Sequence, residues 1–296
     1  MTGRAEDVRV PVVHFPHPGR EHDAPALGRF AWSSLPVHRR KFLRGSGSYA
    51  DAQGRAHRGR VVFWGEWEAA SDVVETWPPE ASLPTALHVP VRVGRRRVRP
   101  GDQNTDPWVF GDHFRYTNCR QRGSMKTLPA GSLLLFGSTI GGEFALDTVF
   151  VVRDSSGPLT LSKLKRHAFC DDVLKASTYD PLSGTSSLAC GPEDPTWTYV
   201  LYRGATPVEQ PDMFSYSPAK PARAGRFSRP IINLGRRPSG EPYVNPANWR
   251  STKGAPKAQW VPAAEARRVW DDVREQVLGD GQGLVLAHHI DSPATP

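Results

Sequence analysis

The sequence predicts an α+β fold that is rich in strands, with a mixed, mainly antiparallel sheet or pseudo-barrel, long loops and a C-terminal helix. Three observations support this prediction. Short apolar runs follow one another without the intervening helices that parallel α/β folds require. Glycine and proline account for 27 and 28 of the 296 residues, which indicates a folded chain with many turns. One amphipathic segment near the C-terminus has helical spacing.

We expect a single domain over residues 1–296, because no linker is long enough to require two. Composition divides the chain into four regions. These are a loop-rich N-terminal region, a β-rich core, a basic loop, and a C-terminal helix with a strand, over residues 1–59, about 60–204, 205–260 and 261–290. Closely spaced prolines exclude a helix from the first region: Pro11, Pro16, Pro18, Pro25 and Pro36.

The clearest strand is predicted over residues 60–68, where side chains of different polarity alternate. Trp64 and Glu66 fall on one face, and Phe63 and Trp67 lie near the other. The alternation predicts a strand with one face toward the core. A short edge strand is expected at 89–93, and further extended segments at 108–110, 114–116, 196–202 and 283–287.

A buried hairpin is predicted next. The apolar runs over 132–137 and 144–152 are separated by Gly141-Gly142, which is typical of a hairpin turn. Asp147 lies inside the second run, where burying a carboxylate costs free energy unless it is paired. Asp147 is therefore either a general acid–base group or a structural anchor.

One helix is predicted between Pro262 and Gly279. Proline suits the first turn of a helix, and glycine commonly follows the last. One face is expected to pack on the body of the protein, through Val269, Trp270, Val273 and Val277. Residues 161–175 hold either a helix or two short turns.

The chain is basic. It has 38 Lys and Arg against 30 Asp and Glu, a formal net charge of +8, with the excess in clusters at 39–44, 92–99 and 220–237. Such clusters attract polyanions, above all nucleic acid. For each cluster, the alternative is that arginine serves simply as a solubilising residue. The residues predicted to contact a nucleic-acid backbone are Arg39, Arg40, Lys41, Arg95, Arg96, Arg97, Arg115, Arg226 and Arg229.

Several features indicate a cytoplasmic protein without a membrane partner. No apolar run approaches the roughly 18 residues of a membrane helix. The polar N-terminal residues lack the apolar segment of a secretion signal. The three cysteines have no CxxC spacing and fit a reducing compartment.

Neither a metal site nor a cofactor is predicted. His14, His17 and His22 could bind zinc, but no cysteine or paired carboxylate completes a known spacing, so their role stays open. The sequence has no GxxxxGK[ST] loop, no GxGxxG after a strand, no GxSxG and no zinc-deaminase signature. NTPases, nicotinamide dehydrogenases, serine hydrolases and deaminases are therefore disfavoured.

The most informative stretch joins an aromatic-Gly turn to a buried strand through Gly111, Arg115, Asn118, Leu128, Gly131, Phe136 and Ser138. Over this small part of the chain the sequence resembles the PUA-like superfamily, especially EVE/ASCH-type and nucleotide-modification-associated domains. Ser132 stands where those domains usually carry aspartate, and the Trp-Gly-Val-Arg-Asn run of EVE domains is absent. The resemblance implies a pseudo-barrel with a cleft for one modified or flipped nucleobase. It also implies a context of DNA modification or phage defence.

The residue chemistry is compatible with such a cleft. A base pocket needs flat apolar walls and fixed polar groups that read the edge of the base. The predicted pocket residues are Trp64, Glu66, Trp67, Trp108, Asp112, Tyr116, Thr117, Asn118 and Ser138. For each aromatic residue taken singly, a place in the core of a sheet is the alternative.

Cys119 is the candidate nucleophile, with Asp147 as its candidate acid–base partner. Neighbouring positive charge favours the thiolate form, whereas a buried, inert thiol is the alternative. Whether the protein is an enzyme therefore stays open.

Three functions are compatible with the sequence. The first is a nucleic-acid-binding protein, with DNA favoured over RNA, that recognises or processes a modified nucleobase. The second is a Cys119-dependent enzyme that acts on a nucleobase or nucleotide. The third is a non-catalytic scaffold whose basic loops bind an acidic protein partner.

Overall fold

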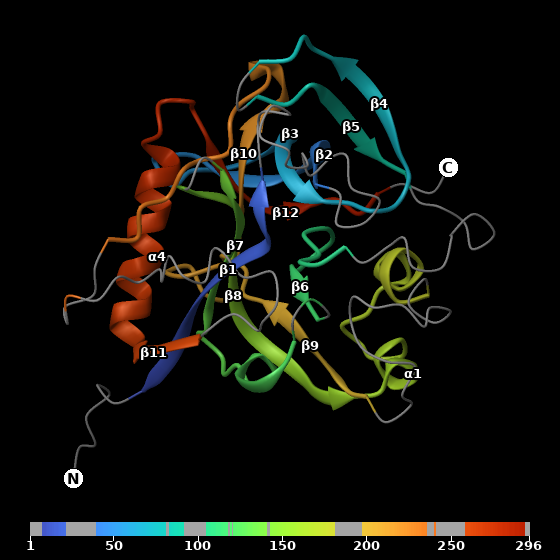
Figure 1. Ribbon diagram of the computed structural model, residues 1–296, viewed down its shortest axis with the longest axis vertical. Coiled ribbons are helices and arrows are strands. Elements are labelled where there is room, and N and C mark those ends of the chain that lie inside the picture. Colours follow the sequence, from blue (N-terminus) through green and yellow to red (C-terminus); the bar gives the residue numbers. More distant parts are fainter. Residues whose placement is uncertain are drawn as a thin grey trace.

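Strands dominate the structure, which is a computed structural model. It describes residues 8–21, 40–80, 83–91, 105–117, 119, 121–140, 143–180, 197–235, 240 and 258–293. Within these ranges the strands form two six-stranded mixed sheets (Figure 1). The prediction of a strand-rich fold with mixed sheets and a C-terminal helix is confirmed.

The first sheet is built on the predicted hairpin. Its order is β11 (Ala258–Pro262), β1 (Arg9–Glu21), β7 (Leu133–Ile140), β8 (Glu143–Leu159), β9 (Tyr199–Gly204) and β6 (Arg115–Tyr116). β7 and β8 pair antiparallel, and β1 runs parallel to β7. The register shifts after Phe136, which pairs with Thr148, because Gly137 pairs with Leu146. Asp147 is therefore the extra residue of a β-bulge, a feature that redirects a side chain.

The second sheet closes on itself. Its order is β12 (Val285–Ile290), β10 (Ser217–Pro221), β3 (Ala56–Glu66), β2 (Arg40–Ala50), β5 (Ala86–Pro90) and β4 (Ser71–Thr76). β12 also pairs with β2, so the pairings among β2, β3, β10 and β12 form a closed circuit. One edge of β2 serves two neighbours, since Phe42 and Leu43 pair with β5 while residues 47–50 pair with β12.

Two glycines of β2 allow this closure. A Cβ atom at Gly47 would lie 2.0 Å from the carbonyl oxygen of His289, and one at Gly45 would lie 2.8 Å from Cγ2 of Ile290. Any larger residue at these positions would push β12 away from β2. The Gly-Ser-Gly sequence of β2 is thus explained by the close approach of another strand.

The regions predicted as loops contain strands. β1 and β2 lie in the loop-rich region 1–59, and β10 and β11 lie in the basic loop 205–260. Residues 8–21 and 40–59, the part of this region that the structure describes, contain no helix, and the fixed φ of proline also suits an extended strand. The edge strand predicted at 89–93 overlaps β5 only at Val89 and Pro90, and residues 92 and 93 lie outside the described part of the chain. β5 lies between β2 and β4, so it is not an edge.

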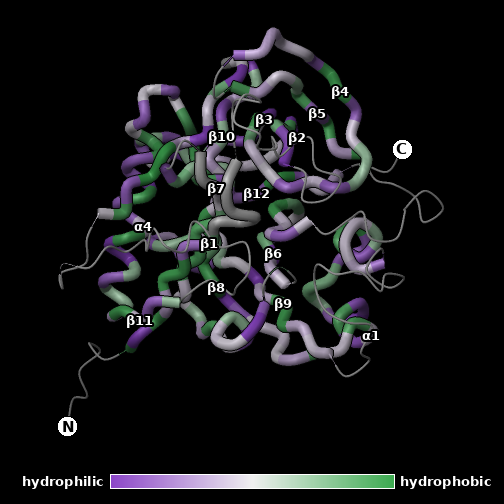
Figure 2. The backbone as a smooth tube through the Cα atoms, viewed as in Figure 1, coloured by the Kyte–Doolittle hydropathy of each residue, from purple (hydrophilic) through white to green (hydrophobic). Residues whose placement is uncertain are grey.

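The predicted C-terminal helix is confirmed as α4 (Ala263–Leu278). Hydrophilic and hydrophobic positions alternate along it in Figure 2, and its apolar face is buried through Ala266, Val269, Trp270, Val273 and Val277. The indole nitrogen of Trp270 donates a 2.9 Å hydrogen bond to the carbonyl of Phe214, which ties the helix to the chain before β10.

Residues 161–175 form short turns, including α1 (Leu161–Leu164) and α2 (Asp172–Leu174). Among the described helices, none is long and apolar enough to cross a bilayer.

Two apolar clusters form the core, one on each face of the first sheet. Phe15, Phe136 and Phe150 point into the cluster that also contains the aromatic residues of β6 and β9. Leu133, Leu135, Val149 and Val151 point into the cluster that α4 covers, which continues to Phe42 and Val62 of the second sheet. Both faces of β7 and β8 are therefore buried, as their continuous apolar runs predict.

Candidate functional site

A buried ionic cluster links the two sheets. Arg40 begins β2 and Glu66 ends β3, and the two are register partners. Asp147 reaches them from the bulge of β8. Arg40 Nη1 lies 2.6 Å from Asp147 Oδ2, and Arg40 Nη2 lies 3.7 Å from Glu66 Oε2. All three residues are at most 2% exposed.

Arg229 completes this cluster from the segment that follows β10. Its Nη1 donates a 2.8 Å hydrogen bond to Ser138 Oγ and lies 3.5 Å from Asp147 Oδ1. Its guanidinium carbon lies 4.8 Å from the ring centroid of Trp64, a cation–π contact. We call these residues the inter-sheet cluster: Arg40, Trp64, Glu66, Ser138, Asp147 and Arg229.

The inter-sheet cluster contains six residues that the sequence predicts as functional. Their charged groups are paired with one another inside the protein, which indicates a structural role. Two guanidiniums and two carboxylates balance in formal charge. Removing one charged member of such a buried group leaves the charge of its partners uncompensated, which is strongly destabilising. The group therefore favours the one register of β2, β3 and β8 in which all its charges are paired. The placement of Asp147 between Arg40 and Arg229 supports its interpretation as a structural anchor.

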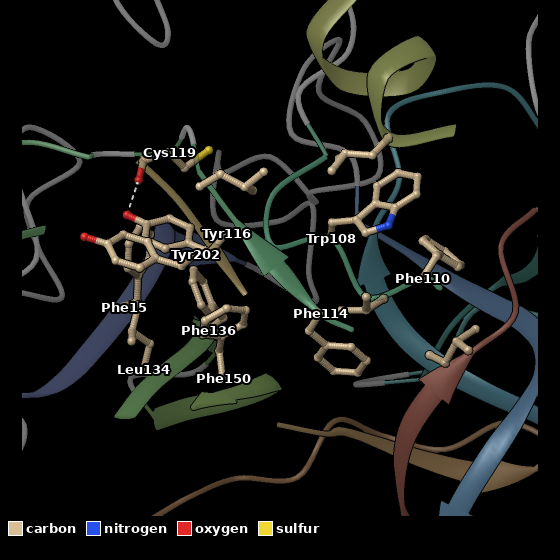
Figure 3. Close-up of a cluster of buried hydrophobic side chains, with 14 of the residues drawn as sticks. Phe15, Trp108, Phe110, Phe114, Tyr116, Cys119, Leu134, Phe136, Phe150 and Tyr202 are labelled. Carbon is tan, nitrogen blue, oxygen red and sulfur yellow. Dashed lines mark hydrogen bonds between the residues drawn. The ribbon is translucent and has the colours of Figure 1, made fainter. Parts of the chain in front are cut away.

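The other predicted pocket aromatics lie in the core. Trp67, Trp108 and Tyr116 are at most 1% exposed and belong to the cluster shown in part in Figure 3. Trp67 packs against Trp108 at 5.9 Å, and Tyr116 stacks on Tyr202 at 5.9 Å. Trp64 packs against the other core cluster. The described aromatics therefore do not converge on one slot for a base.

Cys119 and Thr117 are held by the buried carboxylate of Asp106. Its two oxygens accept hydrogen bonds from the amide of Thr117 at 3.0 Å and of Cys119 at 2.7 Å. The hydroxyl of Tyr116 donates to the carbonyl of Cys119 at 2.8 Å (Figure 3). Cys119 is 2% exposed, which supports the alternative of a buried thiol. Asn118 lies outside the described residues.

Cys170 behaves as an inert thiol. Burial, together with the negative charge of Asp171, raises the pKa of Cys170 to about 12. At neutral pH its sulfur is therefore protonated, and a nucleophilic role is disfavoured.

Arg115 serves as an internal anchor. Its guanidinium donates to the backbone carbonyls of Phe169 and His113, and to Asp112 Oδ1 at 2.8 Å. Burial raises the pKa of Asp112, but the positive charge of Arg115 and hydrogen bonds from His113 and Arg115 outweigh it, so the pKa is lowered overall. This arrangement ties the turn before β6 to the segment before α2.

Two other predicted phosphate-binding residues, Lys41 and Arg226, also bind the protein itself. Lys41 Nζ donates to the carbonyl of Ala69 at 3.1 Å and to Ser71 Oγ at 2.7 Å. Arg226 donates to the carbonyl of Pro78 at 3.0 Å and pairs with Glu80. The rest lie outside the described residues: Arg39, Arg95, Arg96 and Arg97.

The structure reveals a different candidate site at the surface of the second sheet. A pocket of about 330 Å³ opens beside β2 and β3. Its lining residues, here called the arginine groove, are Arg44, Gly45, Ser46, Arg60, Val89, Pro90, Phe110, Asp291, Ser292 and Pro293. The close approach of Ile290 to Gly45 brings residues 291–293 against β2 and so forms one wall.

The arginine groove carries uncompensated positive charge. Asp291 is already bound by Arg58, whose Nη2 lies 2.7 and 2.9 Å from its two oxygens. Within the part of the chain that the structure describes, Arg44 and Arg60 have no ion-pair or side-chain hydrogen-bond partner. Two guanidiniums at a pocket mouth, with hydroxyls nearby, form a site suited to an anion.

Known proteins give no guide to this groove. Comparisons with protein-family models, with curated proteins and with solved structures find no match. The resemblance to the PUA-like superfamily therefore rests on the sequence alone.

The sequence offers a signal for the groove. Arg44 lies two residues before Ser46, and Ser46 is the register partner of Arg60, so all three share one face of the β2–β3 ladder. The alternation of β2 is visible in the sequence once the strand is recognised. It was obscured because region 1–59 reads as loop.

Among the described residues, no three His, Cys, Asp or Glu side chains gather where they could hold a metal ion. His14 is buried on β1, with its ring 4.2 Å from that of Phe144. Burial lowers the pKa of His14 to about 3, so the imidazole is neutral at pH 7. The side chain of His17, and His22 as a whole, lie outside the described parts of the structure.

Proposed function

We propose that the protein binds nucleic acid, with phosphate groups held in the arginine groove. The observation that supports this most directly is the pair of guanidiniums, Arg44 and Arg60, which line a pocket whose one carboxylate, Asp291, is paired with Arg58. Arginine binds phosphate in a two-pronged geometry and stays charged at every physiological pH.

The surroundings of the groove support a polyanionic ligand. The chain has a formal net charge of +8, which attracts nucleic acid over a distance of about 10 Å at 0.1 M salt. Arg58, whose side chain is 60% exposed, lies beside the groove through its ion pair with Asp291. Val89, which is half-buried, adds an apolar side chain beside the arginines, and the buried Pro90 and Phe110 support this wall of the groove from below.

The finer predictions from the resemblance remain part of this proposal. The closed circuit of β2, β3, β10 and β12 is compatible with a PUA-like pseudo-barrel. The proposal includes recognition of a modified base, a preference for DNA over RNA and a cytoplasmic location. The base contacts would have to be made at the groove, because the predicted base-pocket aromatics lie in the core.

The other two functions receive less support. A Cys119-dependent enzyme needs an accessible thiol, and Cys119 is buried. An acidic protein partner could use the same arginines, since guanidinium also binds carboxylate. We favour nucleic acid because the groove combines cationic, hydroxyl and apolar surfaces, which match the phosphate, sugar and base of a nucleotide.

The proposal is tested by fluorescence anisotropy with labelled single-stranded DNA, single-stranded RNA and duplex DNA, each titrated at several NaCl concentrations. We expect binding that weakens linearly with the logarithm of the salt concentration. Arg44→Ala and Arg60→Ala should each reduce this salt slope by about 1, as expected when one phosphate contact is lost. Arg166→Ala, at an exposed position after α1, is the control and should leave the slope unchanged.

Two results would overturn the proposal. One is the absence of binding to all three nucleic acids at low salt. The other is binding that the Arg44→Ala, Arg60→Ala double variant does not weaken. Polyglutamate serves as a parallel probe: salt-dependent binding to polyglutamate but to none of the nucleic acids would select the scaffold alternative.

A further inference from the structure

The two groove arginines are placed to bind the same phosphate. Arg60 is opposite Ser46, and Arg44 lies two residues earlier on β2, so the two arginines are diagonal neighbours on one face of the ladder. Diagonal neighbours are about 7–8 Å apart, a separation that long side chains can bridge. Both guanidiniums can therefore reach one phosphate between them.

The charge of the groove matches a phosphomonoester better than a phosphodiester. Arg44 and Arg60 contribute two positive charges, while Asp291 is occupied by Arg58. A phosphodiester inside a nucleic-acid strand has one negative charge. A phosphomonoester has about 1.5–2 negative charges near pH 7. The monoester, which occurs only at the end of a strand, neutralises the pair more completely.

The dimensions of the groove also favour a strand end. Its volume is about 330 Å³, near the lower limit of the roughly 300–1,000 Å³ that small-ligand sites occupy. This is room for one small group rather than for a run of nucleotides. Ser46 and Ser292 supply hydroxyls that can donate to phosphate oxygens, and Val89, Pro90 and Phe110 line the apolar part.

We infer that the arginine groove binds the phosphorylated end of a nucleic-acid strand, with the terminal phosphomonoester between Arg44 and Arg60. This inference rests on the proposed function and names the part of the nucleic acid that the groove takes. The remaining phosphodiesters would lie along the basic surface outside the groove, near Arg58.

The test compares three single-stranded DNA oligonucleotides of identical sequence with an internal fluorescent label. One has a 5′-phosphate, one a 3′-phosphate, and one has hydroxyls at both ends. Anisotropy titrations at one fixed salt concentration give the three dissociation constants. We expect one phosphorylated form to bind at least about tenfold more tightly than the hydroxyl form, because charge-assisted arginine–phosphate hydrogen bonds are strong.

Variants of the groove arginines test whether the preference for a phosphorylated end arises in the arginine groove. In Arg44→Ala and in Arg60→Ala, the ratio between phosphorylated and hydroxyl forms should fall to about one. Arg60→Lys keeps the charge but loses the two-pronged geometry, so its ratio should lie between those of the alanine variant and the unmodified protein. Arg166→Ala should keep the full ratio.

The outcomes separate this inference from the proposed function. Equal affinity for the three oligonucleotides would overturn the inference and leave nucleic-acid binding intact. No binding to any of them would overturn the proposed function itself. A nucleoside 5′-monophosphate, titrated alone, distinguishes a strand end from a free nucleotide. If it binds as tightly as the phosphorylated oligonucleotide, the ligand is a free nucleotide and the strand-end inference is overturned.

Discussion

Arg40 and Arg44 lie four residues apart on the same face of β2, yet their surroundings differ completely. Arg40 is opposite Glu66 and 2.6 Å from Asp147, and it is 1% exposed. Arg44 is opposite Val62, lines the arginine groove and has no carboxylate partner among the described residues. The same residue type thus serves the fold at one end of the strand and is available to a ligand at the other.

This difference separates the arginines of a basic sequence that are used within the fold from those whose charge is available to a ligand. A cluster such as 39–44 attracts attention through its charge, but burial and carboxylate partners decide what each side chain does. The inter-sheet cluster uses its charges internally, whereas the arginine groove keeps two charges available. Variants that affect one region and leave the other unchanged test this difference.

The largest effect is expected at Asp147. Asp147→Asn keeps the shape of the side chain but leaves Arg40 and Arg229 without their shared carboxylate. Breaking a buried ionic group in this way costs about 3–5 kcal/mol of unfolding free energy, which urea unfolding measures.

The control for this variant is Asp154→Asn. Asp154 pairs with Arg203 at the surface, with its side chain 40% exposed, and such pairs contribute about 0–1 kcal/mol. If Asp147→Asn destabilises the protein no more than Asp154→Asn, the inter-sheet cluster is not an anchor, and Asp147 regains its candidacy as an acid–base group.

The next effect concerns pH and the buried His14. The pKa of His14 is about 3 in the folded protein and close to 6.5 in an unfolded chain. Below pH 6.5 the unfolded chain binds more protons than the folded one, so the unfolding free energy decreases as the pH falls toward 3. At pH 5 the loss is about 2 kcal/mol, since one pKa unit corresponds to about 1.4 kcal/mol.

A His14→Leu variant should therefore lose about 2 kcal/mol less than the unmodified protein between pH 7.5 and pH 5, in urea unfolding at both values. Val12→Leu changes a neighbouring buried position on the same face without a titratable group, and should keep the original pH dependence. If all three proteins lost the same unfolding free energy between the two pH values, the lowered pKa of His14 would not account for the pH dependence.

The third prediction separates stability from binding. Arg44→Ala and Arg60→Ala should change the unfolding free energy by no more than about 0.5 kcal/mol, as surface substitutions usually do. The same variants should weaken nucleic-acid binding by about tenfold or more. Arg40→Ala should be strongly destabilised in the same urea series. Similar destabilisation by all three variants would remove the distinction between the two regions.

The sequence predicted the parts of the fold whose signals are local. The hairpin of β7 and β8, the strand β3 and the helix α4 follow from apolar runs, alternation and capping residues. β1 and β2 were missed because prolines and glycines obscure their alternation, and those glycines are required by β12, which lies far along the chain. The inter-sheet cluster likewise depends on the β-bulge at Asp147, which no local sequence pattern predicts.

The site predictions show the same limit. Different patterns predict Trp64, Glu66, Ser138 and Asp147 as site residues. The structure brings the four together, although in a buried arrangement. Arg44 and Arg60 become a site only through the register of β2 and β3 and the return of residues 291–293. The return of residues 291–293 is a long-range contact, which sequence spacing does not encode.

The smallest effect is expected at Asp291, and its direction is opposite to that of the arginine variants. Asp291→Asn removes the negative charge from the arginine groove and releases Arg58, so more positive charge faces the ligand. Asp291 is 39% exposed and Arg58 60% exposed, so this surface pair contributes little to stability. We expect nucleic-acid affinity to rise by about two- to fivefold at low salt, an increase that 0.5 M NaCl removes by screening.

The backbone hydrogen bond from Asp291 to Ser46, 2.7 Å long, is retained in this variant. A decrease in affinity would mean that the carboxylate of Asp291 itself contacts the ligand, as it would with a sugar hydroxyl, and the groove would then recognise more than phosphate.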